Sequence, residues 1–182
     1  MDLIASLNNT TQQVTQNFSA LSNAQMNWKP DVSKWSIAQC IDHLIVSNST
    51  YFPTFDKLIN KAYQLPLIQK LNPFNKVFGP IMVKHLGPQS KQKLKSPKIF
   101  TPSTSTLSST IIEDFSKHQE VLINYFHQLN HLDKDTIVIT SPVNSFVSYS
   151  LHYAMQIIAV HEQRHFNQAM NVLSHPTYPE SL

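Results

Sequence analysis

The sequence predicts an all-α protein, a four-helix bundle in which one domain spans residues 1–182. Three observations predict it. Glycine occurs only at Gly79 and Gly87, so the glycine-rich phosphate loops of nucleotide-binding α/β folds are excluded and an all-β fold is disfavoured. Four long segments carry apolar residues at helical spacing. A hydrophobic fraction of 41% supplies a packed core without disulfides, which the single Cys40 excludes.

The first half of the chain predicts two helices. Residues 3–22 carry apolar side chains mostly three, four or seven apart, and the segment around Pro30 ends this helix. A second helix is expected from Ser33 or Ser36 to about Asn60. Pro53 lies inside it and is expected to kink the helix or to end its first half.

A long connection follows over about residues 61–103. It holds six prolines and both glycines, and only a short helix around Val77–His85 is predicted. Nine lysines and no acidic residue lie between Lys57 and Ile112. Lysine without arginine disfavours nucleic-acid recognition, so we expect a surface loop, or a loop that covers a pocket or a dimer interface. The apolar residues here are expected to pack on the bundle or on a second chain. They are Leu65, Leu67, Ile68, Phe74, Val77, Phe78 and Ile81.

The second half predicts two more helices. One begins at the Ser/Thr run 103–106 and reaches about His131. The β-branched run Thr136–Thr140 is expected to form a short strand or an extended linker. The last helix is expected from about Ser148 to Leu173, and Pro176 stops it.

The pair His161 and His165 is the most informative of nine histidines. A spacing of four residues places both imidazoles on one helix face, where they suit a shared metal ion or a hydrogen-bonded polar pair equally well. The intervening residues also fit the H-E-x-x-H pattern of zinc proteases, with Glu162 as the base. That interpretation is disfavoured, because few residues follow His165 to supply a third ligand.

A third ligand must therefore come from another helix. Bundles build metal sites from facing helices, and the candidates are His43, His118, His127 and His152. Helical periodicity does not favour His43, which it places on the side of Cys40 and away from the apolar stripe. Cys40 itself is expected to be a small core residue.

Two segments resemble the DinB/YfiT-like superfamily. Residues 28–30 read WKP and residues 35–44 read WSIAQCIDHL, similar to the family's second-helix signature; residues 159–168 read AVHEQRHFNQ, similar to its last-helix signature. The resemblance implies up-down-down-up topology with a long crossover between helices two and three. It also implies a divalent metal, Zn or Ni, on three histidines that match His43, His161 and His165. Asp42 stands where the family often has Glu.

The same resemblance implies an activity. Members include S-transferases that use low-molecular-weight thiols, and many are labelled metal-dependent hydrolases, so a small-molecule substrate and a homodimer are expected. Three imidazoles leave metal positions open for water or a thiol, and we expect no protein carboxylate among the ligands. The alternative is a non-catalytic helical binding module with vestigial histidines.

The remaining expectations concern location. The N-terminus lacks the basic and apolar regions of a signal peptide, and no segment approaches the ~18 apolar residues of a membrane span. A cytoplasmic protein without membrane or nucleic-acid partners is expected, and the sequence assigns no catalytic side chain beyond the metal ligands.

Overall fold

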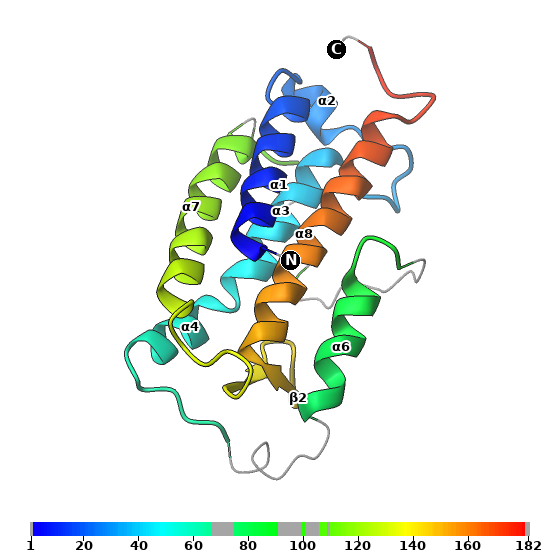
Figure 1. Ribbon diagram of the computed structural model, residues 1–182. Helices are drawn as coiled ribbons and strands as arrows, with labels where there is room; N and C mark the ends of the chain where they lie inside the picture. The colour runs from blue at the N-terminus through cyan, green and yellow to red at the C-terminus, as the bar shows by residue number, and fades with distance from the viewer. Residues whose placement is uncertain (1, 67–74, 91–99, 101–105, 109, 181–182) are drawn as a thin grey trace.

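The computed structural model describes residues 2–66, 75–90, 100, 106–108 and 110–180. Most of these residues are helical, and four long helices run side by side along the molecule (Figure 1). They are α1 (Leu3–Phe18), α3 (Ile37–Ser49), α7 (Ile111–Leu129) and α8 (Leu151–Leu173). Helix α3 packs on α7 and α8, and α1 packs on the same two helices. Within the described part of the chain, no helix is long and apolar enough to span a bilayer.

Side-chain caps fix where the N-terminal helices begin. Asp2 accepts a hydrogen bond from the Ala5 amide and starts α1. The predicted helix over 3–22 ends earlier, at Phe18, because Ser22 caps a separate short helix, α2 (Asn23–Asn27). Ser36 forms a capping box with Gln39 and starts α3, one of the two predicted positions.

The predicted second helix is divided in two. Helix α3 ends at Ser49, and α4 (Phe52–Ile59) follows with Pro53 in its first turn. The break that Pro53 predicted is confirmed, since proline is tolerated in a first turn but not in a helix interior.

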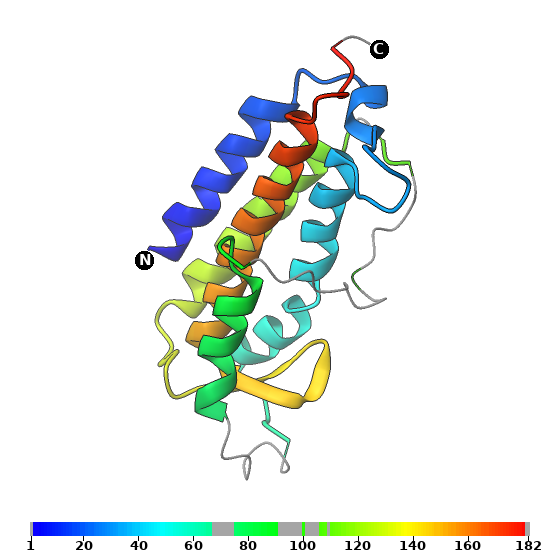
Figure 2. The same ribbon diagram turned by 90° about the vertical axis from the view of Figure 1, so that its right-hand side faces the viewer.

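The long connection contains the predicted short helix, α6 (Asn75–Leu86). This helix packs on α8 and on strand β2, and it lies beside the lower half of α8 (Figure 2). Gly79 permits the close approach, because a Cβ atom there would lie 2.3 Å from the Tyr153 ring. Of the apolar residues predicted to pack here, Leu67, Ile68 and Phe74 lie outside the described residues.

The all-α prediction is wrong between α7 and α8. Strands β1 (Val138–Ser141) and β2 (Asn144–Ser150) pair as an antiparallel hairpin, so the segment of Thr136–Thr140 is mostly strand. The last helix starts at Leu151, because Ser150 is its cap and residues 144–150 are extended. The predicted helix over 103–131 starts at Ile111, and residues 103–105 of its expected cap lie outside the described residues.

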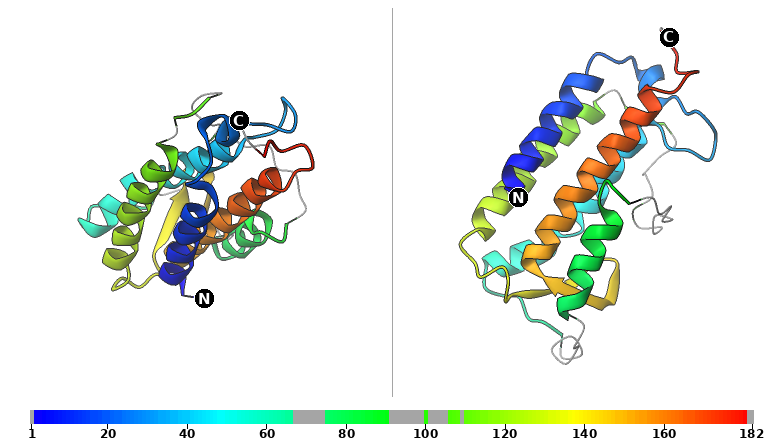
Figure 3. Two further views of the ribbon diagram at one scale, coloured as in Figure 1. Left: turned by 90° about the horizontal axis from the view of Figure 1, so that it is seen from above. Right: turned by 45° about the vertical axis from the view of Figure 1, so that its right-hand side comes forward.

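The core consists of two apolar clusters separated by a polar layer. Each of the four long helices contributes a fully or almost fully buried polar side chain at the level between the clusters. These are Thr10, Asn48, Gln119 and Glu162. Seen from above, the four helices are grouped around a shared interior (Figure 3). Layers of this kind fix the register of packed helices, since a shift would bury polar groups against apolar ones.

Candidate metal centre

His43 lies in the buried centre of α3, where only 2% of its surface is exposed. The periodicity argument placed it near the surface, and that prediction is wrong. All residues from Ile37 to Leu44 are buried, because α2, α7 and α8 surround this helix. A helix covered on several sides has no single apolar stripe from which to measure an angle.

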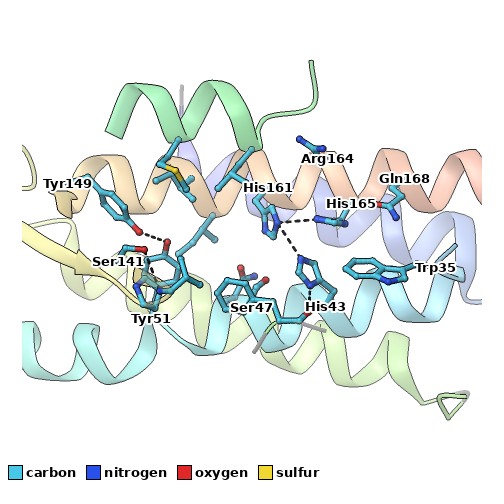
Figure 4. A pocket seen from close by; sticks show the side chains of 18 of the residues that line it. Trp35, His43, Ser47, Tyr51, Ser141, Tyr149, His161, Arg164, His165 and Gln168 are labelled. Carbon is cyan, nitrogen blue, oxygen red and sulfur yellow. Dashed lines mark hydrogen bonds between the residues drawn. The ribbon is translucent and has the colours of Figure 1, made fainter. Parts of the chain in front are cut away.

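His161 and His165 face His43 from α8. The Nε2 atom of His161 lies 3.3 Å from Nε2 of His43 and 3.0 Å from Nε2 of His165 (Figure 4). The four-residue spacing therefore places both imidazoles on one face, as expected, and α3 supplies the third. One nitrogen from each residue lies within 4.8 Å of the others, which is close enough for the group to hold a metal ion.

The backbone at Phe100 sets the tautomer of His43. Nδ1 of His43 lies 2.6 Å from the Phe100 carbonyl oxygen, which accepts hydrogen bonds and cannot donate them. Nδ1 therefore carries the proton, and the lone pair of Nε2 points toward the other two histidines. Outer-shell contacts of this type orient the ring of a metal-ligating histidine.

All three imidazoles are held neutral. Burial lowers the pKa of His43, against smaller upward effects of the Phe100 carbonyl and Asp42. Burial, followed by the electrostatic effects of His43 and Arg164, lowers the pKa of His161 to about 3. Burial and the neighbouring charges keep the pKa of His165 well below its usual value. Neutral imidazole is the form that ligates metals.

The positions of the three nitrogens fit a shared metal ion better than hydrogen bonds among the three rings. Two nitrogens held about 2.0–2.1 Å from a zinc ion at roughly 90–110° would lie about 2.9–3.4 Å apart, and the observed 3.0 and 3.3 Å match. A proton on Nε2 of His161 can form a hydrogen bond to only one of the two neighbouring histidines. The Nε2 lone pair of the other histidine would then face the His161 nitrogen without a proton between them. Among the described residues, no cysteine or carboxylate joins this group, so Cys40, Asp42 and Glu162 are not in reach.

Trp35 covers the histidine cluster from one side. Its ring centroid lies 4.8 Å from that of His43 and 5.7 Å from that of His165, stacked on the latter at 26°. Sequence reasoning did not predict that Trp35 contacts these histidines. No periodic signal marks it, because Trp35 precedes α3 and reaches the histidines from a loop.

The cluster opens into a pocket of about 670 Å³. Arg164 lines the pocket beside the histidines and donates a hydrogen bond to the His85 carbonyl oxygen at the C-terminal end of α6. Helix α6 contributes Met82 and Leu86 to the lining. The lysine-rich connection therefore covers the pocket with its helix, one of the roles expected for it.

Glu162 points away from the pocket, although it is adjacent to His161. It is completely buried, and its Oε1 accepts hydrogen bonds of 2.7 Å from both Asn48 and Gln119. Burial raises the pKa of Glu162 to about 8, against the opposing effect of these two bonds, so the group is mostly protonated at neutral pH. The base of the H-E-x-x-H protease pattern has no counterpart here.

The other sequence candidates lie apart from the cluster. His118 is buried on α7 and stacks on Phe52, His127 is exposed, and His152 contacts Tyr153 at the start of α8. Cys40 belongs to the apolar core, as expected, and burial raises the pKa of its thiol.

The chain also matches a known protein family. A model of the DinB superfamily matches residues 6–169, which is most of the chain. The chain belongs to the DinB superfamily. The match spans all three clustered histidines and confirms the resemblance that the two segments suggested. No curated protein and no solved structure matches the chain.

Proposed function

We propose that this DinB superfamily protein is an enzyme in which His43, His161 and His165 hold one divalent metal, Zn²⁺ or Ni²⁺. The enzyme activates a small thiol for transfer to a small-molecule substrate, or alternatively it activates water to hydrolyse such a substrate. The observation that carries the proposal is the convergence of three neutral Nε2 atoms at one end of a pocket. The metal-binding character of the superfamily supports it.

When bound, such a metal supplies a Lewis acid that lowers the pKa of a thiol or water. The chain supplies the rest. The Phe100 carbonyl keeps the His43 lone pair directed inward, and Trp35 restricts the rings of His43 and His165. Arg164 places a positive charge beside the histidines, which favours an anionic nucleophile at that end.

The pocket favours a thiol over water as the nucleophile. No Asp or Glu is among the described residues that line it, so no carboxylate is placed to take a proton from water during attack. A thiol that has already lost its proton to solvent needs no such base. Its sulfur forms the new bond to carbon, and the leaving group departs with the electron pair of the broken bond.

A second proposal concerns how the helices are arranged. We infer a single domain whose bundle comprises α1, α3 with α4, α7 and α8, in up-down-down-up order, with α6 in the crossover. The contacts among these four long helices support it. A homodimer stays a prediction of the family resemblance.

The first test is metal content in protein purified without a histidine tag. We expect about one Zn²⁺ or Ni²⁺ per chain after loading, and less than about 0.2 in His161→Ala and His165→Ala. His127→Ala is the matched control, because His127 is an exposed helical histidine outside the site, and it should retain the metal. Wild-type protein that takes up neither metal would overturn the proposal and favour the non-catalytic binding module.

The second test is turnover. Loaded protein is incubated with a panel of small thiols and 1-chloro-2,4-dinitrobenzene, whose thioether product absorbs in the near ultraviolet, and separately with 4-nitrophenyl acetate without thiol. We expect metal-dependent thioether formation that His161→Ala loses and His127→Ala keeps. Turnover of the ester alone would instead assign a hydrolase.

A further inference from the structure

The pocket has a second polar end, opposite the histidines. Tyr51, Ser141 and Tyr149 line it there, and we call these three residues the hydroxyl end. Figure 4 shows them grouped away from His43, His161 and His165, with Ser47 between the two groups. No step of the proposed chemistry uses them.

The hydroxyl end is built from two separate parts of the chain. Tyr51 is buried at the junction of α3 and α4. Ser141 ends β1 and Tyr149 lies in β2, so the hairpin that was absent from the sequence prediction supplies both. The two phenol oxygens lie 2.8 Å apart, and the Ser141 side chain also hydrogen-bonds Tyr149.

The hydroxyl end has hydrogen-bonding capacity left over. Its three hydroxyl groups hold three protons, and their two mutual hydrogen bonds use two of them. The Val143 amide donates to the Ser141 hydroxyl oxygen, so among the described residues one hydroxyl donor and several lone pairs remain in side chains that line the cavity. Burial raises the pKa of both Tyr51 and Tyr149, so the phenols stay protonated and uncharged.

The span between the two ends is set by helix geometry. His43, Ser47 and Tyr51 are four residues apart and line the same pocket, so eight residues at about 1.5 Å each separate the ends by roughly 12 Å. The wall between them is largely apolar. Ile157 and Ile158 of α8 face it, together with Met82 and Leu86 of α6.

Charge is confined to the histidine end. Among the described lining residues, the charged side chains are Lys34, next to Trp35, and Arg164, next to His165. The hydroxyl end offers neither a cation nor an anion to pair with an ionic group. A buried ionic group without a partner is strongly disfavoured, whereas a neutral polar group gains hydrogen bonds from hydroxyls.

We propose that Tyr51, Ser141 and Tyr149 form a recognition subsite for a neutral polar group, such as a hydroxyl or an amide, at the far end of an elongated apolar substrate. The reacting group of that substrate lies at the histidines, so this placement rests on the proposed function. The subsite selects substrates by length and by their terminal group. It takes no part in the bond-making step.

The test uses metal-anchored probes of defined length. Zinc-loaded protein is titrated calorimetrically with octanehydroxamic acid and with 8-hydroxyoctanehydroxamic acid, which differ only in the terminal hydroxyl. We expect the hydroxylated probe to bind about tenfold more tightly, the gain of one well-placed hydrogen bond. Homologues of about six to ten carbons should show the gain only near the length that spans roughly 12 Å.

Tyr51→Phe and Tyr149→Phe keep both rings and remove one hydroxyl each. We expect each variant to lose most of the tenfold gain while binding octanehydroxamic acid as the wild type does. Tyr125→Phe is the matched control, because its hydroxyl bonds Asp56 outside the pocket, and it should keep the gain. Ser141→Ala provides a further test if either tyrosine variant fails to fold.

The outcomes separate the two proposals. If both probes bind equally to the wild type, or if the gain survives in Tyr51→Phe and Tyr149→Phe, the subsite is wrong and the metal site stands. If the protein takes up no metal, the proposed function is wrong, and the comparison moves to 1-octanol with the metal-free protein. Weaker binding of 1-octanol to Tyr149→Phe than to Tyr125→Phe then supports the subsite, and equal binding overturns it.

Discussion

At the residue scale, two neighbours on one helix serve different purposes. His161 faces the pocket, whereas Glu162 is rotated by about 100° and enters the polar layer of the core. There it accepts hydrogen bonds from Asn48 of α3 and Gln119 of α7, which connects three helices through one carboxyl group. A histidine–glutamate dipeptide therefore carries no evidence of general-base chemistry without the direction of each side chain.

Replacement of Glu162 tests whether this residue stabilises the core without taking part in catalysis. Glu162→Gln is nearly isosteric with the protonated acid and should cost less than about 1.5 kcal/mol of unfolding free energy, with metal uptake and turnover unchanged. Glu162→Ala strands two buried amide donors and leaves a cavity, and should cost about 3–5 kcal/mol. Urea unfolding measures both values. A large loss of turnover in a folded, metal-loaded Glu162→Gln protein would show that this residue takes part in catalysis.

The ligand residues differ in how far the sequence predicts them. His161 and His165 follow from spacing on one helix, but His43 followed only from the family resemblance, because α3 is buried on most sides. Trp35 and the Phe100 carbonyl reach the site from irregular segments, where no periodicity exists to place them. The sequence could have predicted that Tyr51 lies on the same side as His43, because it follows His43 by eight residues on a nearly continuous helical path.

At the scale of elements, helices were predictable and the hairpin was not. The long helices and the short α6 all appear, and α3 and α8 begin at the capping serines Ser36 and Ser150. The sequence predicted a short strand or an extended linker over Thr136–Thr140, but not its partner β2, because β2 runs directly into α8 and its last residues were assigned to that helix. The β-branched and aromatic residues of the two strands were the available signal.

Helix α6 forms one wall of the pocket, and its position depends on Gly79. In Gly79→Ala, the new methyl group would lie 2.3 Å from the Tyr153 ring, so α6 must move away from α8. We expect a loss of about 1–3 kcal/mol in unfolding free energy and weaker binding of octanehydroxamic acid, with unchanged metal content.

Val77→Ala is the matched control for α6. Val77 is half exposed on the same helix, so its truncation should change neither probe affinity nor stability by more than about 0.5 kcal/mol. Full compensation of Gly79→Ala by Tyr153→Ala would confirm the contact as the cause. Unchanged probe binding in Gly79→Ala would show that α6 does not shape the pocket.

At the scale of the whole molecule, the polar layer and the histidine cluster both join α3 to α8. The polar layer divides the core into two apolar clusters. The three histidines lie where α3 and α8 border the pocket. Asn48 belongs to the polar layer, where it hydrogen-bonds Glu162, and it also lines the pocket. The relative position of α3 and α8 therefore determines core packing and site geometry together.

Metal binding should for this reason stabilise the entire fold. The proposed ligands come from positions 43, 161 and 165, so a bound ion bridges helices that are more than one hundred residues apart in sequence. A metal present at about 100 times its dissociation constant adds roughly 2.7 kcal/mol to the folded state. For a chain of this size, that corresponds to a rise of about 5–10 °C in the unfolding temperature.

Differential scanning calorimetry with and without a chelator measures this rise. His43→Ala should abolish the rise even though His161 and His165 remain on one helix, because two ligands on α8 no longer connect it to α3. His127→Ala should retain the full rise. A metal that binds the wild type but shifts the unfolding temperature equally in His43→Ala would mean that α8 alone holds the ion, and the bridging role of His43 would then be wrong.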